Sequence, residues 1–124
     1  MNMHRILVVD DHPINRRLAV MLLNGAGRET DEAASGEEAL QKLAARQYDG
    51  VLLDVSMPGI SGNEVCARIR ADEKLRSLRV VAYTAHAFDD ERSAILAAGY
   101  DALVTKPISK DRLLAAIDGA SAAG

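Results

Sequence analysis

The chain of 124 residues is long enough to form one domain around its own hydrophobic core. Hydrophobic residues make up 48% and charged residues 27%, and a net charge of −3 offers no basic surface, so direct binding to nucleic acid is not expected. No run reaches the roughly 18 apolar residues of a membrane span, and the opening MNMHRILVV is too short for a secretory signal. We therefore expect a cytoplasmic protein without a membrane partner. Cys66 is the single cysteine, and we expect it to be a small packing residue.

Short apolar runs alternate with longer segments of helical period, which is typical of a parallel sheet covered by helices. The first run, 6–9, ends at the acidic pair Asp10 and Asp11. Pro13 suits the first position of the helix that follows. The apolar residues that recur on one face of this helix are Ile14, Leu18, Met21 and Leu22.

The segment after the first helix is unusually polar for a strand. Gly25 and Gly27 are expected to end the helix, and a second strand is expected at about 28–33. A strand covered on both faces is normally apolar. The acidic residues of this segment, which place it at an edge of the sheet, are Glu29, Asp31 and Glu32.

Serines mark the starts of three later helices. Ser35 with Glu38, and Ser61 with Glu64, have the spacing of capping boxes, in which the two side chains satisfy free backbone amides. Ser109 precedes the last helix. The sequence therefore predicts helices that begin after these three serines.

The remaining apolar runs each end at a polar residue. They are 51–53, which ends at Asp54; 80–83, which ends at Thr84; and 102–104, which leads to Lys106. The chain thus contains five strand–helix units and no linker, and we expect one domain over 1–124, with a core at about 4–119 and a frayed tail at 120–124.

These polar residues are expected to meet. The carboxyl ends of the strands in an open α/β sheet form one crevice where ligands bind. Asp10, Asp11 and Asp54 would repel one another there unless a cation offsets their charge, and carboxylate oxygens suit Mg²⁺. Singly, an aspartate is also a common helix cap or turn residue. Their joint position at strand ends, with Thr84 and Lys106, favours a functional site.

The segments that carry these residues resemble the signatures of response-regulator receiver domains, and the resemblance covers nearly the whole chain. They read VVDDHPINRRL, LLDVSMPGISG, VVAYTA and TKPI. The resemblance implies a flavodoxin-like α/β fold, a doubly wound five-stranded parallel sheet of order 2-1-3-4-5 with five helices. It also implies a single-domain response regulator, similar to the chemotaxis response regulators, in a two-component or phosphorelay system.

Roles for the site residues follow from the resemblance. Asp54 would accept a phosphoryl group from the phosphohistidine of a histidine kinase or histidine phosphotransfer protein. Asp11, Asp54 and the backbone carbonyl of Ser56 would bind Mg²⁺ directly, and Asp10 would bind it through water. Lys106 would contact the phosphoryl oxygens. The protein would not be an enzyme in the ordinary sense. It would catalyse only the phosphotransfer to itself and its own dephosphorylation.

The resemblance also names the neighbours of the phosphoryl group. Thr84 would be the switch, because its hydroxyl turns inward to the phosphoryl group. Ser56, Ala85 and His86 would lie beside the group, and Ser56 and His86 would influence its hydrolysis. Pro107 resembles the family's cis-proline, which would aim the lysine before it.

One position departs from the family. An aromatic residue usually stands three positions before the lysine, where this chain has Leu103. We expect switching here to use the Thr84 loop and the packing of Leu103 against the fourth helix, although a leucine there is also an ordinary edge-strand residue. The output surface for an unidentified protein target would include Asp90, Arg92, Leu103 and Lys110.

Three other functions are alternatives to this one. A receiver excised from a hybrid histidine kinase stays open, because DDHPINRRL resembles such receivers, while the initiating MNMHR favours an independent gene. A small phosphohydrolase with Asp54 as nucleophile is less favoured, since haloacid-dehalogenase-type enzymes have a second aspartate where Ser56 stands. A dinucleotide-binding module is excluded, because no G-x-G-x-x-G follows the first strand.

Overall fold

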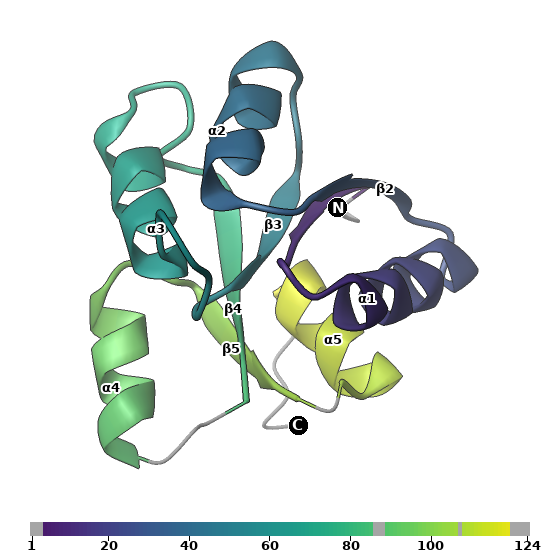
Figure 1. Cartoon of the computed structure of the whole chain (residues 1–124). Helices are drawn as coiled ribbons and strands as arrows, with labels where there is room; N and C mark the ends of the chain where they lie inside the picture. Colours follow the sequence, from purple (N-terminus) through teal and green to yellow (C-terminus); the bar gives the residue numbers. More distant parts are fainter. Residues whose placement is uncertain (1–3, 86–88, 107, 120–124) are drawn as a thin grey trace.

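A computed structural model describes residues 4–85, 89–106 and 108–119, and five strands alternate with five helices along this part of the chain (Figure 1). The strands are β1 (Arg5–Val9), β2 (Glu29–Ala33), β3 (Gly50–Asp54), β4 (Arg79–Thr84) and β5 (Ala102–Thr105). The helices are α1 (Pro13–Gly25), α2 (Gly36–Ala45), α3 (Gly62–Ala71), α4 (Asp89–Ala97) and α5 (Lys110–Asp118).

The five strands form one parallel sheet in the order β2-β1-β3-β4-β5. Both the fold class and the strand order predicted from the sequence are confirmed. The polar strand β2 lies at an edge, as its acidic residues indicated. An edge strand tolerates these residues because part of it faces water.

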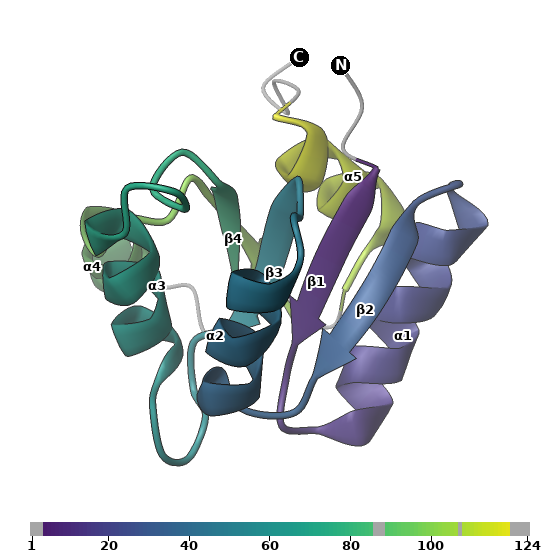
Figure 2. The same cartoon turned by 90° about the horizontal axis from the view of Figure 1, so that it is seen from above.

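Helices cover the sheet on both faces: α1 and α5 lie on one face, and α2, α3 and α4 lie on the other (Figure 2). Successive residues of a strand point to opposite faces, so neighbouring residues of β1 enter different cores. Leu7 and Val9 pack in the core under α2 and α3, which also contains Cys66. Ile6 and Val8 pack in the core under α1 and α5. The free Cys66 is fully buried, which confirms its prediction as a packing residue.

Helix α1 does not pack through the apolar stripe that recurs along its sequence. Ile14, Leu18 and Met21 are 75%, 40% and 67% exposed, and Leu22 is only partly buried. The buried residues of α1 are Ala19, Val20 and Leu23. The helix therefore has apolar residues on two sides. The side with Ala19, Val20 and Leu23 faces the sheet, and the stripe of Ile14, Leu18 and Met21 is exposed.

The serine caps form as predicted at two of three helices. The side chains of Ser35 and Ser61 accept hydrogen bonds from the backbone N–H groups of Glu38 and Glu64. The Glu38 carboxylate in turn accepts from the backbone N–H of Ala34. Ser109 occupies the N-cap position of α5 but makes no side-chain cap hydrogen bond.

Three expectations lie outside the described residues: the role of His86, the cis bond at Pro107, and the frayed tail at 120–124. Within the described ranges, no helix is both long and apolar enough to cross a membrane.

Candidate functional site

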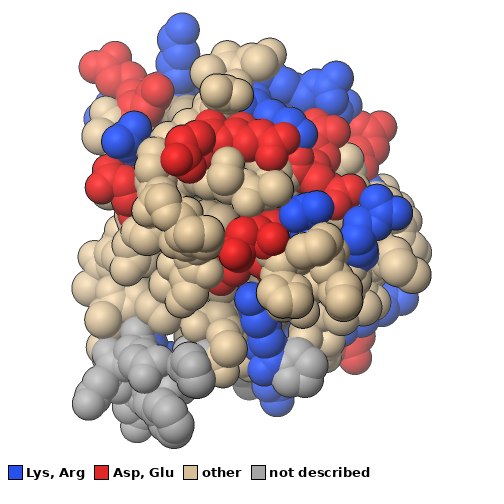
Figure 3. Space-filling view, in the orientation of Figure 1, with Lys and Arg blue, Asp and Glu red and all other residues tan. Residues whose placement is uncertain are grey.

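The parallel sheet brings together the polar residues that end its strands. Asp10 and Asp11 follow β1, Asp54 and Thr84 are the last residues of β3 and β4, and Lys106 follows β5. The strands β1 and β3 are neighbours, and so are β3 and β4. Acidic side chains gather near the middle of the face shown in Figure 3, with basic side chains beside them. The predicted convergence is therefore present.

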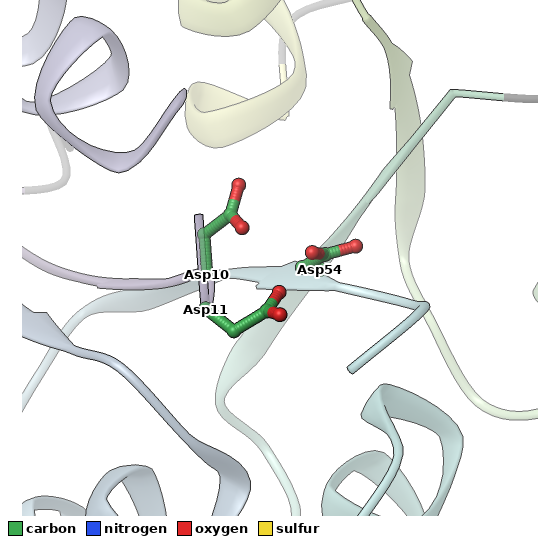
Figure 4. A group of neighbouring side chains, drawn as sticks. All are labelled: Asp10, Asp11 and Asp54. Carbon is green, nitrogen blue, oxygen red and sulfur yellow. The ribbon is translucent and has the colours of Figure 1, made fainter. Parts of the chain in front are cut away.

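Three carboxylates form the centre of this site. Asp10, Asp11 and Asp54 each place a carboxylate oxygen within 4.8 Å of the others. Figure 4 shows Asp10 and Asp11 on one segment and Asp54 beside them on the neighbouring strand. Asp10 is fully buried and Asp54 is 3% exposed, whereas Asp11 is exposed. The cluster is thus open to solvent on the Asp11 side.

Lys106 forms ion pairs with two of these carboxylates. Its Nζ lies 3.5 Å from an oxygen of Asp10 and 3.5 Å from an oxygen of Asp54. The same Nζ lies 4.6 Å from the ring centroid of Tyr83, which is a cation–π contact. The backbone N–H of Lys106 also donates to the carbonyl of Thr84. Tyr83 therefore helps to hold the lysine over the site, a role for which the sequence contains no signal.

The electrostatics of the site make the ionised form of Asp54 costly. Burial, and then the neighbouring Asp10 carboxyl, raise the pKa of Asp54 to about 6. The backbone N–H of Ser56 and the charge of Lys106 act in the opposite direction but do not outweigh them. One lysine consequently compensates the charge of the cluster only in part.

Backbone amides fix two of the carboxylates. Asp10 Oδ1 accepts from the backbone N–H of His12 at 2.8 Å, and Asp54 Oδ1 accepts from that of Ser56 at 3.0 Å. The second oxygen of Asp10 is buried and has no hydrogen-bond partner in the described part of the chain, since Lys106 at 3.5 Å makes only an ion pair. A buried oxygen of this kind, beside two further carboxylates, fits a hard divalent cation such as Mg²⁺ or its bound water.

Arg16 holds the backbone of Asp10 in place, a role that the sequence does not indicate. Its guanidinium donates to the backbone carbonyl of Asp10 at 2.8 Å and to the Glu32 carboxylate at 2.9 Å. It therefore connects α1, the end of β1 and the edge strand β2. A single sequence does not reveal such an arginine, because its two partners, Asp10 and Glu32, come from different elements.

Gly62 allows the first turn of α3 to approach β3 closely. A Cβ atom at Gly62 would lie 2.3 Å from the carbonyl oxygen of Asp54 and 2.8 Å from the Cα of Val55. Both distances are shorter than real Cβ contacts, so a side chain here would displace the backbone next to Asp54. The Gly62 N–H also donates to the Val55 carbonyl at 3.2 Å.

The other expected site residues differ in burial. Thr84 is 6% exposed at the end of β4, and Ser56 and Ala85 are exposed. Leu103 is half-buried and packs against the core under α2 and α3. It also lines a cleft of about 410 Å³ together with residues of α4 and α5. A larger cleft of about 570 Å³, lined by residues of 43–49 and 74–78, contains none of the site residues.

Comparison with known proteins identifies relatives of this chain. The family model described as "Response regulator receiver domain" matches residues 6–118. The sensor protein GacS of Pseudomonas syringae pv. syringae is 41% identical over 112 residues, which are 88% of this chain and 12% of that protein. The chain therefore spans only a small part of this sensor protein. The polar-differentiation response regulator DivK of Brucella ovis is 35% identical over 112 residues, which are 90% of this chain and 91% of that protein.

Solved structures share the fold. The receiver domain of the sensor histidine kinase PA1611 from Pseudomonas aeruginosa, solved with a magnesium ion coordinated in its active-site cleft, is 28% identical with a TM-score of 0.84. That match covers 94% of this chain and 95% of the other. The chemotaxis protein CheY4 of Vibrio cholerae is also 28% identical with a TM-score of 0.84, over 90% of this chain and 93% of the other.

Proposed function

The chain belongs to the response regulator receiver family and is a phosphoryl acceptor in signalling rather than an enzyme in the ordinary sense, and we propose that Asp54 is the residue that accepts the phosphoryl group. The observation that carries this proposal is the position of the Asp54 carboxylate. One of its oxygens lies within 4.8 Å of carboxylate oxygens of Asp10 and Asp11, and Oδ2 lies 3.5 Å from Lys106 Nζ. Asp10 also pairs with Lys106, but it is fully buried, and the family resemblance assigns the acceptor role to Asp54, the last residue of β3.

The proposed reaction is one displacement at phosphorus. An oxygen of the Asp54 carboxylate forms a bond to the phosphorus of a phosphohistidine, the P–N bond breaks, and its electron pair returns to the imidazole nitrogen. Asp54 Oδ1 is engaged by the Ser56 N–H, so Oδ2, which faces Lys106, is the nucleophilic oxygen. Lys106 then contacts the oxygens of the transferred group, where it offsets their negative charge.

The three carboxylates would hold Mg²⁺, which neutralises charge on the phosphoryl oxygens during transfer. We propose that Asp11, Asp54 and the Ser56 carbonyl would bind the ion directly. Asp10 would bind it through water. The buried and unpartnered Asp10 oxygen supports it, because a metal-bound water would supply the missing hydrogen bond. Thr84 as the switch, with Ser56, Ala85 and His86 beside the phosphoryl group, is proposed on the family resemblance.

Incubation with acetyl phosphate and Mg²⁺, followed by intact-mass measurement, tests the role of Asp54. The wild-type protein should gain the mass of one phosphoryl group, and Asp54→Asn should gain none. Asp72→Asn is a matched control, because Asp72 is the C-cap residue of α3 and is not one of the site residues. This substitution should leave labelling intact. Labelling should also disappear when Mg²⁺ is chelated. Persistent labelling of Asp54→Asn would disprove the assignment.

The exposed side of α1 is the surface that we assign to the phosphodonor. Ile14, Leu18 and Met21 form an exposed apolar stripe at positions i, i+4 and i+7. The stripe begins three residues after Asp11, and Arg17 beside it is 67% exposed at its side chain. A histidine that reacts with Asp54 must approach over this rim, so a helix of a histidine kinase or phosphotransfer protein with an apolar face and acidic neighbours would fit the stripe.

The target of the phosphorylated form would bind at the cleft between α4, β5 and α5. Leu96 and Leu103 provide apolar surface there, and the cleft is flanked by Arg92 and Arg112. An acidic segment with an apolar anchor has the complementary chemistry. We also propose a cytoplasmic location. Both a stand-alone regulator and a part of a larger kinase fit the relatives, which include a response regulator of which the chain covers 91% and a sensor protein of which it covers 12%.

A further inference from the structure

Tyr100 is a buried aromatic residue in the turn between α4 and β5. It is 5% exposed, and its ring belongs to the core under α2 and α3. Cys66 of α3 and Val55, which follows Asp54, belong to or pack against the same core. The side chain thus extends from the α4–β5 turn toward the segment that carries Asp54.

The hydroxyl of Tyr100 has no hydrogen-bond partner among the described residues. A buried polar atom without a partner is unfavourable, and the few that occur in folded proteins call for an explanation. Burial is the main cause that raises the pKa of Tyr100, with smaller contributions from Cys66 and Asp54. The phenol therefore keeps its proton at neutral pH and is available as a donor.

The hydroxyl lies close to the backbone of Asp54, next to Gly62. The place that a Gly62 Cβ would occupy is 2.9 Å from Tyr100 Oη and 2.3 Å from the Asp54 carbonyl oxygen. Both atoms therefore border the same small space. A donor without a partner and a main-chain acceptor therefore lie near each other, but no hydrogen bond joins them in this structure.

The turn that carries Tyr100 is firmly held. Arg70 donates to the carbonyl of Gly99 at 2.8 Å and to the carboxylate of Asp101 at 2.8 Å. Asp101 also exchanges hydrogen bonds with the backbone of Val80, at 2.8 Å in both directions. Since both neighbours of Tyr100 are fixed, formation of the missing bond requires movement of the Asp54 segment rather than of the turn.

We infer that Tyr100 is a positioning residue whose hydroxyl donates a hydrogen bond to the main-chain carbonyl of Asp54 when Mg²⁺ and a phosphoryl group occupy the site. The inference rests on the proposed role of Asp54. A contact that exists equally in both states cannot shift the equilibrium between them, whereas a bond that forms in only one state favours that state. The unpartnered hydroxyl is suited to this role because its bond is still to be made.

The experiment compares the wild-type protein with Tyr100→Phe, which removes only the hydroxyl. Beryllium trifluoride with saturating Mg²⁺ serves as the phosphoryl mimic, and its affinity is measured by calorimetry. Loss of one net hydrogen bond should weaken binding of the mimic roughly two- to tenfold in Tyr100→Phe. The melting temperature of the ligand-free variant should be unchanged or higher, because no bond is lost in that state.

Tyr48→Phe is the matched control. The Tyr48 hydroxyl already donates to Asp31 at 2.6 Å, far from the site. Its removal should lower the melting temperature with and without the mimic and leave the affinity for the mimic unchanged. The ¹³C chemical shift of the Asp54 carbonyl gives a second measurement, and its change on binding of the mimic should be smaller in Tyr100→Phe than in the wild type.

The outcomes are distinguishable. Equal affinities of the wild type and Tyr100→Phe for the mimic, with equal changes of the Asp54 carbonyl shift, would overturn the inference while leaving the role of Asp54 intact. A lower melting temperature of ligand-free Tyr100→Phe would also overturn it, because the hydroxyl would then already have a partner. Failure of the wild type to bind the mimic would overturn the proposed function itself.

Discussion

At the scale of single residues, the site depends on groups whose partners come from other elements. Lys106 reaches Asp10 and Asp54 while its Nζ lies over the Tyr83 ring, and Arg16 supports the carbonyl of Asp10. The charges of Asp10, Asp54 and Lys106 follow from residue type, so they were foreseeable. The contacts of Tyr83 and Arg16 were not, because nothing in their local sequence distinguishes them from ordinary core and surface residues.

Tyr48 and Asp31 give a residue-scale prediction about pH. The Tyr48 hydrogen bond, assisted by Arg46 and Arg5, lowers the pKa of Asp31 below 3.8, and burial and Asp31 raise the pKa of Tyr48 to about 12. A lowered carboxyl pKa stabilises the fold above pH 3.8, and the stabilisation is lost as pH falls through the folded-state value. A raised phenol pKa stabilises below pH 10, and this is lost as pH rises through about 12.

Tyr48→Phe should therefore reduce the free energy of unfolding by about 1 kcal/mol at pH 7, the usual order for one lost hydrogen bond. The difference from the wild type should shrink below pH 3.8 and above pH 10. Urea unfolding across this pH range measures it. A difference that stays constant across the range would show that the contact does not depend on ionisation.

At the scale of secondary-structure elements, α1 shows where hydrophobic periodicity is ambiguous. Periodicity shows which residues share a face of a helix, but it does not show which of two apolar faces is buried. Leu18 and Leu23 lie on different sides of α1, and only Leu23 is fully buried. The caps at Ser35 and Ser61 were predictable, because their bonds join residues three positions apart in the sequence.

The two faces of α1 should respond differently to substitution. Leu23→Ala should lower the free energy of unfolding by roughly 2–5 kcal/mol, because it removes a fully buried side chain. Met21→Ser, on the exposed side, should change it by less than about 0.5 kcal/mol. Urea unfolding of the two variants tests the assignment, which is contradicted if Met21→Ser is the more destabilising.

Met21→Ser and Ile14→Ser should also separate donor binding from chemistry. Phosphotransfer from a phosphorylated histidine-containing partner should slow in these variants, while labelling by acetyl phosphate should match the wild type. Arg68→Ser, an exposed change on α3, serves as control for a surface substitution. Equal rates with the protein donor in all variants would exclude the exposed stripe of α1 as its docking surface.

At the scale of the whole molecule, the sheet concentrates negative charge at one end, and the fold tolerates this because a cation can bind there. A ligand that binds only the folded state stabilises it, by about 2.7 kcal/mol when its concentration is 100 times its Kd. Mg²⁺ should therefore raise the urea midpoint of the wild type relative to the same protein in EDTA. The increase should be mostly lost in Asp54→Asn and kept in Asp72→Asn. Equal midpoints with and without Mg²⁺ in the wild type would contradict a metal site at the three carboxylates.

The sequence by itself determined the α/β class, the edge position of β2 and the convergence of Asp10, Asp54 and Lys106, since strand ends in a parallel sheet meet at one edge whatever the details of packing. Only the tertiary structure decided which side of α1 faces the sheet, and that the hydroxyl of Tyr100 borders the Asp54 carbonyl. The physical reason is the range of the interactions. Alternation of polarity and capping are local and repeat along the chain, whereas packing and long-range hydrogen bonds depend on how distant segments fit together in three dimensions.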